Sequence, residues 1–197
     1  MRRLASSVVS TIVIGVPCLA AASMWQIDPV HTSAQFAVRH LMVSTVRGAL
    51  GKVTGTAKLD DSDLTKSSVE ASIDVTGIDT REPKRDEHLK SPDFFDVAKY
   101  PTITFKSKKI TPVSDSKFQV TGDLTMHGVT KEVVLDVEGS PKPFTDPMGN
   151  LKLGGVANTK LNRKDFGVQW NKAMDGGGVV VGDTVDVTID VELIKQK

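Results

Sequence analysis

Cysteine, aromatic residues and net charge are all scarce in this chain of 197 residues. It has one cysteine, 5% aromatic residues and a formal net charge of +1. A balanced charge gives no overall attraction to nucleic acid or to acidic membranes. The chain has no G-x-S-x-G nucleophile motif, and its triple glycine at 176–178 lacks the Lys-Ser/Thr of a phosphate-binding loop. The sequence therefore gives no support for the common classes of hydrolase or nucleotide-binding protein.

Histidine is also sparse, with four residues at positions 31, 40, 88 and 127. None of them forms a metal-binding pair such as His-x-x-x-His on a helix. His31 and His40 lie on or beside one predicted strand, about 30 Å apart if that strand is fully extended. We therefore predict that the protein has no metal site.

The N-terminus has the features of a secretory signal peptide. Arginines at positions 2 and 3 are followed by a largely apolar segment that ends in small residues near Ala22. We predict cleavage after Ala22, with residues 1–22 as the signal peptide, 23–197 as the mature domain and the periplasm as its location. Cleavage also removes Cys18, and with it disulfides and thiol catalysis. An uncleaved anchor is the alternative, although the apolar run is short for a span of roughly 20 residues.

Apolar and polar residues alternate with a period of two through most of the mature domain. This pattern is typical of antiparallel strands that bury one face. The alternating segments are 31–40, 51–60, 67–75, 102–106, 118–126, 131–139, 151–161 and 184–193. Short turns between them favour sequential hairpins. The sequence predicts an all-β fold, an eight-stranded antiparallel up-and-down barrel that is just wide enough to fill itself or to hold one small ligand.

Several positions on the apolar faces carry small residues. They are Ala34, Gly55, Ala57, Ala71, Gly122 and Ala157. Small inward side chains leave room for a ligand inside the barrel. The glycines among them are equally typical of bulges and bends. The sequence leaves both interpretations open.

Two long insertions interrupt the strand pattern, at 79–96 and 162–183. In the first, we predict a short helix over about 81–90, capped by Thr80 and followed by the pair Phe94 and Phe95. The second contains Trp170 and the triple glycine. Long ordered loops in compact domains are often functional lids. We expect a short helix and a long loop at the mouth of the barrel, with the aromatic pair as a gate or as part of the core.

Four segments resemble one known family over essentially the whole mature chain. They are WQIDPVHTSAQFAVRHLMVSTVRGALGKVTG (25–55), DEHLKSPDFFDVAKYPTITFKS (86–107), VTGDLTMHGVTKEVVLDV (120–137) and LNRKDFGV (161–168). The resemblance is to the YceI-like family of secreted bacterial proteins, which are akin to polyisoprenoid-binding periplasmic proteins. One departure is Met42, where the family pattern leads us to expect a small or polar residue. The resemblance implies a lipocalin-like barrel that is not an enzyme and holds a long apolar chain.

Together these arguments predict non-catalytic binding, transport or storage of an amphipathic lipid, of polyisoprenoid or fatty-acyl type. The residues expected to contact its tail are Phe36, Val38, Phe94, Phe95, Phe105, Phe118, Leu124, Trp170, Val187 and Ile189. The candidates for its head group are Arg81, Arg85, His88 and Arg163. No cofactor is expected apart from a bound isoprenoid lipid. The expected partner is a small-molecule lipid, without nucleic acid or stable membrane insertion after cleavage, and a homodimer that covers a long ligand stays open.

Two other functions remain as alternatives. A small hydrolase or isomerase could use His88 with Asp93 or Asp96, although no candidate reaction is visible in the sequence. A haem- or quinone-linked redox partner is the other, because lipocalin-like cavities can take planar cofactors.

Overall fold

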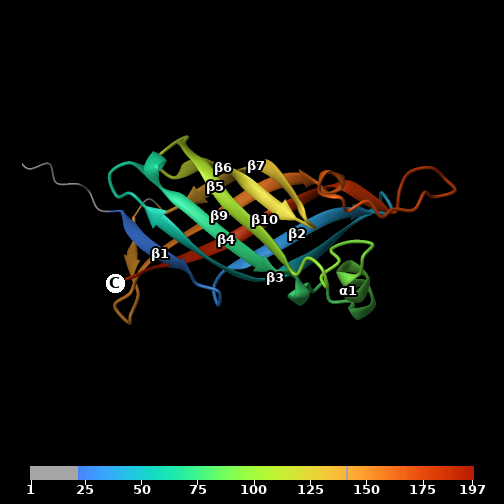
Figure 1. The fold of residues 1–197 in the computed structure, drawn as a ribbon, viewed down its shortest axis with the longest axis horizontal. Coiled ribbons are helices and arrows are strands. Elements are labelled where there is room, and N and C mark those ends of the chain that lie inside the picture. Colours follow the sequence, from blue (N-terminus) through green and yellow to red (C-terminus); the bar gives the residue numbers. More distant parts are fainter. Residues whose placement is uncertain (1–21, 141) are drawn as a thin grey trace, which may run out of the picture.

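The computed structural model describes residues 22–140 and 142–197, so the predicted signal peptide and Cys18 lie outside the described residues. The chain folds into a closed antiparallel barrel, as predicted (Figure 1). Its eight strands are β2 (Ser33–His40), β3 (Ser44–Leu59), β4 (Ser68–Asp74), β5 (Thr102–Pro112), β6 (Lys117–Met126), β7 (Val129–Gly139), β9 (Leu151–Asn162) and β10 (Val181–Lys195). Each pairs with its sequence neighbours, and β10 closes the barrel by pairing with both β9 and β2.

Two further strands extend the eight-stranded plan. Strand β1 (Ser23–Ile27) pairs with the end of β10 and with the end of β3, on the side of β2. Strands β1 and β2 therefore fill one position of the barrel wall in series, separated by a turn at 28–32. Strand β8 (Phe144–Thr145) adds a short pairing to the start of β9. Strand β1, whose Trp25 is only 1% exposed, was not predicted from the sequence.

The helix in the first insertion, α1 (Pro83–Lys90), forms close to its predicted place. Its N-cap is Glu82, whose side chain accepts a hydrogen bond from the Lys84 N–H, and Pro83 occupies the first helical position. The prediction that Thr80 caps this helix is wrong. The Thr80 hydroxyl instead donates to Asp86 Oδ1 in the first turn, and Arg85 Nε donates to that hydroxyl.

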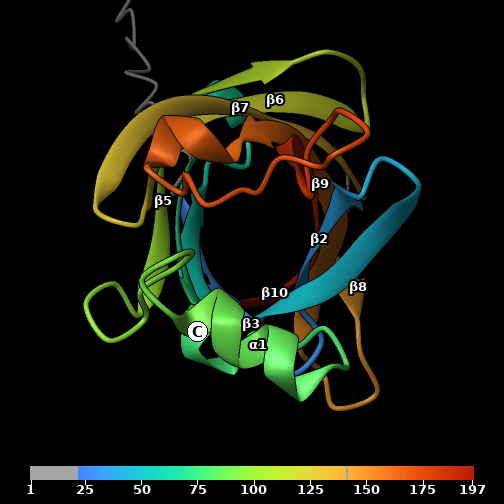
Figure 2. The ribbon, with the colours of Figure 1, turned by 90° about the vertical axis from the view of Figure 1, so that its right-hand side faces the viewer.

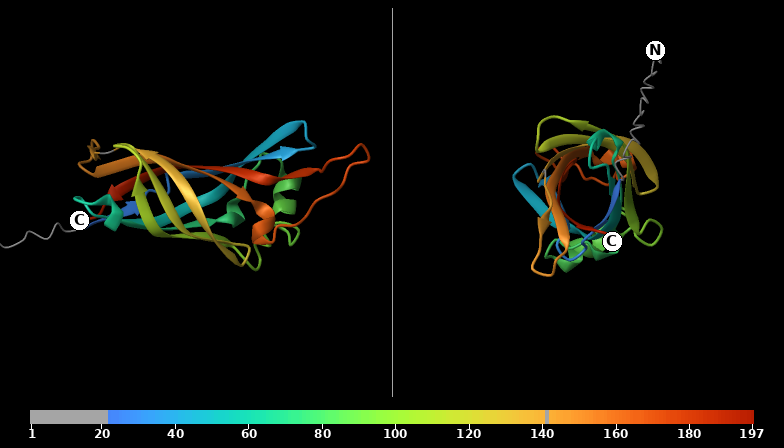
Figure 3. Two further views of the ribbon diagram at one scale, coloured as in Figure 1. Left: turned by 90° about the horizontal axis from the view of Figure 1, so that it is seen from above. Right: turned by 90° about the vertical axis from the view of Figure 1, so that its left-hand side faces the viewer.

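The described part of the chain also contains three short 3₁₀ helices: η1 (Leu64–Lys66), η2 (Val75–Gly77) and η3 (Arg163–Phe166). Helix α1 and the segment 167–180 both lie at one end of the barrel, where they flank its opening in the end-on view of Figure 2. We call this the α1 end. The opposite end holds the β3–β4 and β5–β6 turns and the C-terminus, as both views in Figure 3 show. A short helix and a long loop therefore lie at one mouth, as predicted.

The apolar faces of the strands point inward, but the extent of their burial differs around the barrel. A buried core cluster includes Phe36, Val53, Ile73 and Ile103. By contrast, no residue of β10 is fully buried, although its apolar side chains face inward. The inner wall of β10 therefore stays accessible.

One of the small inward residues has a packing reason. A Cβ atom on Gly122 would lie 2.6 Å from Phe105 Cζ and 2.5 Å from the Lys106 carbonyl oxygen. Gly122 sits opposite Ser107, next to a register irregularity in the β5–β6 pairing. The lack of a side chain at Gly122 therefore makes room for the Phe105 ring and for the irregularity in β5, rather than for a ligand.

No helix within residues 22–140 and 142–197 is long and apolar enough to cross a membrane.

Candidate ligand-binding tunnel

The barrel encloses a cavity of about 1140 Å³. Its lining includes His88 and Val180 at the α1 end, and Asp61, Ser114 and Lys195 at the opposite end. We call it the tunnel, because the lining extends from one end of the barrel to the other. Its volume exceeds the roughly 300–1,000 Å³ of pockets that hold drug-sized ligands.

The tunnel wall is formed mainly by the inward apolar side chains of the strands. All ten residues predicted to contact a lipid tail line it: Phe36, Val38, Phe94, Phe95, Phe105, Phe118, Leu124, Trp170, Val187 and Ile189. On β10, Val185, Val187 and Ile189 are only half-buried, because their free sides face the tunnel. The outward residues between them are polar, such as Asp186. The strand alternation therefore places an apolar surface around an enclosed space.

Three aromatic rings pack together where the tunnel reaches α1. Phe94 and His88 meet edge to face, with ring centroids 5.0 Å apart, and His88 meets Trp170 in the same way at 5.0 Å. Phe94 and Trp170 are tilted against each other at 5.2 Å. Such aromatic pairs contribute stability in addition to that from burying their apolar surface. This aromatic group joins both predicted insertions over the tunnel.

His88 also contacts one of the two acids proposed beside it. Its Nε2 lies 2.8 Å from Asp93 Oδ2, and both side chains are exposed. Asp96 instead has a positive φ of 46°, and its backbone carbonyl accepts hydrogen bonds from Lys99 and Tyr100. The structure thus brings His88 together with Asp93, while Asp96 shapes the following turn.

The four head-group candidates occupy different places. Arg85 and His88 line the tunnel, whereas Arg81 is exposed and lies outside the lining. Arg163 lines the tunnel but is only 5% exposed. Its guanidinium donates to the backbone carbonyls of Val168 (2.8 Å), Trp170 (2.9 Å) and Gly182 (2.9 Å).

Arg163 acts as the anchor of the long loop. Burial lowers the pKa of its guanidinium, while Asp183, 3.5 Å away, opposes that shift. The remaining N–H groups face the Val181 carbonyl and that carboxylate. The side chain therefore ties residues 168–170 to the start of β10 and has its donors engaged within the protein.

The two ends of the tunnel differ in charge. Basic residues dominate the lining at the α1 end: Arg39, Lys84, Arg85 and the buried Arg163, with Glu82 as the acidic exception. Acidic residues dominate the opposite rim: Asp60, Asp61, Asp63 and Asp115, with Lys195 as the basic exception. Hydrogen bonds from neighbouring hydroxyl and backbone N–H groups lower the pKa of Asp60 and Asp63, so these acids remain charged.

Residues 25–193 match the YceI-like domain. The chain belongs to the YceI-like family. A UPF0312 protein of Vibrio cholerae serotype O1 is 37% identical over 161 residues, which cover 80% of this chain and 84% of the relative. A UPF0312 protein of Staphylococcus aureus is 36% identical and covers 84% of this chain and 94% of the relative.

Solved structures agree with this YceI-like assignment. The Campylobacter jejuni YCEI protein is 28% identical with a TM-score of 0.67, covering 81% of this chain and 90% of that chain. Burkholderia cenocepacia BcnA is 23% identical with a TM-score of 0.71, covering 84% and 98%. A polyisoprenoid binding domain from Saccharophagus degradans is 12% identical with a TM-score of 0.63, covering 87% and 98%. The last two share the fold at low identity.

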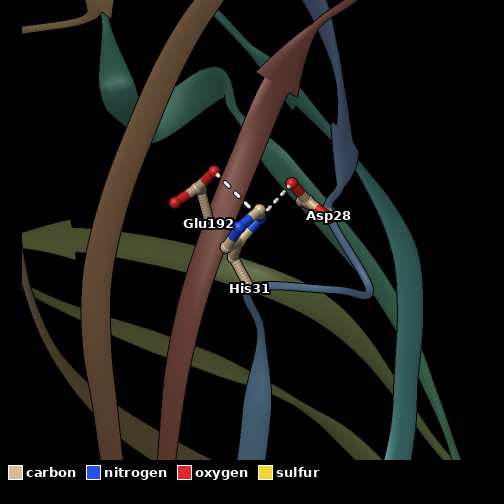
Figure 4. A group of neighbouring side chains, drawn as sticks. All are labelled: Asp28, His31 and Glu192. Carbon is tan, nitrogen blue, oxygen red and sulfur yellow. Dashed lines mark hydrogen bonds and ion pairs between the residues drawn. The ribbon is translucent and has the colours of Figure 1, made fainter. Parts of the chain in front are cut away.

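Outside the tunnel, the YceI-like barrel holds a polar cluster that the sequence analysis missed (Figure 4). In the turn between β1 and β2, His31 Nδ1 lies 2.8 Å from Asp28 Oδ2 and 3.7 Å from Glu192 Oε1 on β10. The hydrogen bond with His31, then one from the Val30 N–H, lowers the pKa of Asp28 to about 2.

These three residues have the donor types of a metal site, with ligand atoms within 4.8 Å of one another. However, Lys152 Nζ lies 3.5 Å from Asp28 Oδ2 and 2.5 Å from Glu192 Oε1. The ammonium group thus already supplies the positive charge that two close carboxylates require. We interpret the cluster as an ion-pair network that fastens the β1–β2 turn to β9 and β10. Its members are up to 164 positions apart in sequence, so no local motif marks it.

Proposed function

We propose that this YceI-like protein binds and carries a long-chain amphipathic lipid, of polyisoprenoid or fatty-acyl type, inside the tunnel. The observation that carries the proposal is the accessible inner wall. Apolar side chains such as Val187 and Ile189 face inward yet stay half-buried, because the side of each that faces the tunnel is open. An apolar guest that covered them would gain about 0.8 kcal/mol for each buried methylene.

The length of the tunnel favours a long chain over a compact ligand. Its lining runs along β10 from Val181 to Lys195. At about 3.3 Å per residue and a strand tilt of about 40°, that stretch rises about 35 Å. An extended hydrocarbon advances about 1.2 Å per carbon, judged from the 3.3–3.6 Å that three backbone bonds span. A chain of up to about 30 carbons therefore has room.

We place the lipid head group at the α1 end. Arg85 and His88 line the tunnel there, and an anionic or amide head could accept hydrogen bonds from them. The opposite rim carries mainly aspartates, which would repel an anionic head. Arg81 and Arg163 are left out of this set, since one lies outside the lining and the other anchors the long loop.

We further propose that the protein acts without catalysis, in the periplasm after removal of residues 1–22. Support comes from the family and from the Saccharophagus degradans neighbour, which is itself a polyisoprenoid binding domain. The exposed His88–Asp93 pair packs against Phe94 and Trp170, so it has a structural use in the aromatic group.

Native mass spectrometry tests this function. The full chain is expressed in a bacterium, and the protein recovered from the periplasm is measured intact and again after organic extraction. We expect a mass excess that extraction releases as an intact long-chain lipid. Repeated recovery of empty protein, together with no binding of added long-chain prenyl alcohols, would contradict the proposal.

The same measurement separates the alternatives. A cleaved or rearranged lipid that depends on His88 would favour a hydrolase or isomerase. A visible absorbance band would favour a haem- or quinone-linked partner. The native mass also gives the subunit number, and thus tests the homodimer.

A further inference from the structure

Three consecutive apolar residues stand exposed at the tip of the β2–β3 hairpin. Leu41, Met42 and Val43 are 39%, 57% and 78% exposed. Leu41 and Met42 have positive φ values of 50° and 61°, a conformation that bulky residues rarely adopt. Met42 is also the residue that departs from the family pattern. We call these three residues the apolar tip.

The apolar tip is held in place rather than loosely attached. The Leu41 N–H donates to the Val180 carbonyl (2.8 Å), which joins the hairpin to the long loop. Arg39 Nη2 donates to the Met42 carbonyl (2.7 Å) inside the turn. A Cβ on Gly178 would lie 3.2 Å from Met42 Cγ and 3.3 Å from Met174 Cε, so these residues pack together. Two segments thus present one apolar surface.

This surface lies beside the α1 end of the tunnel. The segment 167–180 projects beyond the barrel there, with the β2–β3 hairpin next to it (Figures 1 and 3). Between Ala173 and Val180 the only charged residue is Asp175. The tunnel lining itself reaches Arg39, His40 and Val180. An apolar surface therefore borders the opening through which a lipid would pass.

Basic side chains lie on the elements that form the apolar tip and the α1 mouth, where Glu82 and Asp175 are the acidic exceptions. Arg39 and Arg47 flank the apolar tip on the hairpin, Lys172 lies on the long loop, and Lys84 lies on α1, and all four are exposed. Within the described residues, none of the four has an acidic group within 4.0 Å among the ion pairs. The lining of the far rim carries Asp60, Asp61, Asp63 and Asp115, with Lys195 among them and with Asp63 paired to Lys66 at 3.3 Å. The charge along the tunnel axis is thus polarised.

We propose that the α1 end docks on the surface of an anionic lipid bilayer, with the apolar tip inserted between head groups. Apolar insertion and basic residues together give peripheral membrane binding. The acidic rim at the other end would be repelled, so the α1 mouth faces the membrane. Docking itself does not depend on the tunnel's ligand, but its purpose, lipid exchange with the bilayer, rests on the proposed function.

A bilayer suits this surface better than a protein partner. Stable protein interfaces bury about 1,200–2,000 Å² against a complementary surface. The apolar tip consists of three exposed side chains at the end of a hairpin, which is a small area compared with such an interface. Lipid head groups can part around such a tip, and their negative charge matches the nearby arginines and lysines.

Sedimentation with vesicles tests the proposal. Protein from cells that express the full chain is mixed with vesicles of phosphatidylcholine, with or without phosphatidylglycerol, at low and high salt. The test variant is Leu41→Asn with Met42→Asn and Val43→Ser, because asparagine tolerates positive φ. The matched control is Val113→Ser with Phe144→Ser and Met148→Ser, three exposed apolar residues at the far end.

We expect the tip variant to bind anionic vesicles roughly tenfold more weakly than the wild type, while the control variant stays within about twofold. Lys172→Glu, which leaves the apolar tip intact, should weaken binding roughly fivefold or more. High salt or the omission of phosphatidylglycerol should weaken it too. Equal loss in the tip and control variants, or equal binding to neutral vesicles, would overturn the proposal.

Two further readouts keep the outcomes distinct. Sedimentation without vesicles reports self-association. If the wild type forms a dimer but does not bind vesicles, and the tip variant is monomeric, this surface would be an interface with a second copy of the chain. Binding of a long-chain prenyl alcohol in solution reports the tunnel, and the tip variant should retain it. Loss of tunnel binding in every protein, with vesicle binding intact, would reject the proposed function alone.

Discussion

Replacing Ala157 by tryptophan is expected to divide the tunnel near its middle. Ala157 lines the tunnel from β9 and lies opposite Ile189 on β10. The stretch from Val181 to Ile189 rises about 20 Å at 3.3 Å per residue and a tilt of about 40°. That length holds about 16 carbons at about 1.2 Å each. A ligand that enters from the α1 end would then stop at the indole ring.

The expected consequence is a change in how affinity depends on chain length. In the wild type, each methylene adds at most about 0.8 kcal/mol, or roughly fourfold in Kd, until the tunnel is full near 30 carbons. In the variant, the gain should cease near 16 carbons. Between about 16 and 24 carbons, the difference amounts to an upper limit of about 6 kcal/mol, which chain-ordering entropy reduces.

Displacement of a fluorescent fatty probe by single-chain alcohols of about 12, 16, 20 and 24 carbons measures this dependence. Asn158→Trp is the matched control, because it places the same ring on the same strand but on the exposed outer face. Thermal unfolding checks that both variants fold. If Ala157→Trp keeps the length dependence of the wild type, the chain does not thread past this position and our reasoning about the tunnel is wrong.

Three further predictions concern stability and release. The pKa of Asp28 is lowered to about 2 from an ordinary 3.8, which stabilises the folded state by about 2 kcal/mol at pH values above 3.8; this stabilisation is lost as the pH falls toward 2. Asp28→Asn should therefore make the unfolding free energy measured in urea less dependent on pH between pH 4 and 2. An unchanged pH dependence would contradict this prediction. Arg163→Met removes the side-chain donors of the Val168, Trp170 and Gly182 carbonyls and should lower the unfolding free energy by about 3 kcal/mol or more, also measured in urea; a loss below about 1 kcal/mol would refute its anchoring role. Phe94→Ala should lower stability by about 3 kcal/mol and speed release of a bound chain in stopped-flow measurements; unchanged release would make Phe94 a core residue only.

Much of the barrel could be predicted from the period-two pattern. That pattern depends only on neighbouring residues, since successive side chains of a strand point to opposite faces. It located the eight main strands and placed residues such as Phe36 and Val187 on the inner face. Strand β1 was not predicted because it has only five residues, and because its burial comes from pairing with β3 and β10 far along the chain.

Side-chain roles that depend on how the two long insertions fold could not be predicted. Arg163 looked like a free cation for a lipid head group, but the folded loop surrounds it with carbonyls. Thr80 was predicted to cap the helix, but its hydroxyl donates to Asp86 and accepts a hydrogen bond from Arg85. Both expectations came from residue type and position in the sequence, whereas the conformation of the folded insertions sets the actual partners.

By itself, the sequence determined the strand order, the inward set of apolar residues and the family. Only the tertiary structure decided that these residues leave an open tunnel, since the space inside a barrel depends on how all its strands close together. The tertiary structure also separated the charges. A net charge of +1 predicted no attraction to acidic membranes, yet the tunnel lining in the described residues is mainly basic at the α1 end and mainly acidic at the other. Composition sums charges over the chain, whereas a membrane or a ligand responds only to those on the surface it meets.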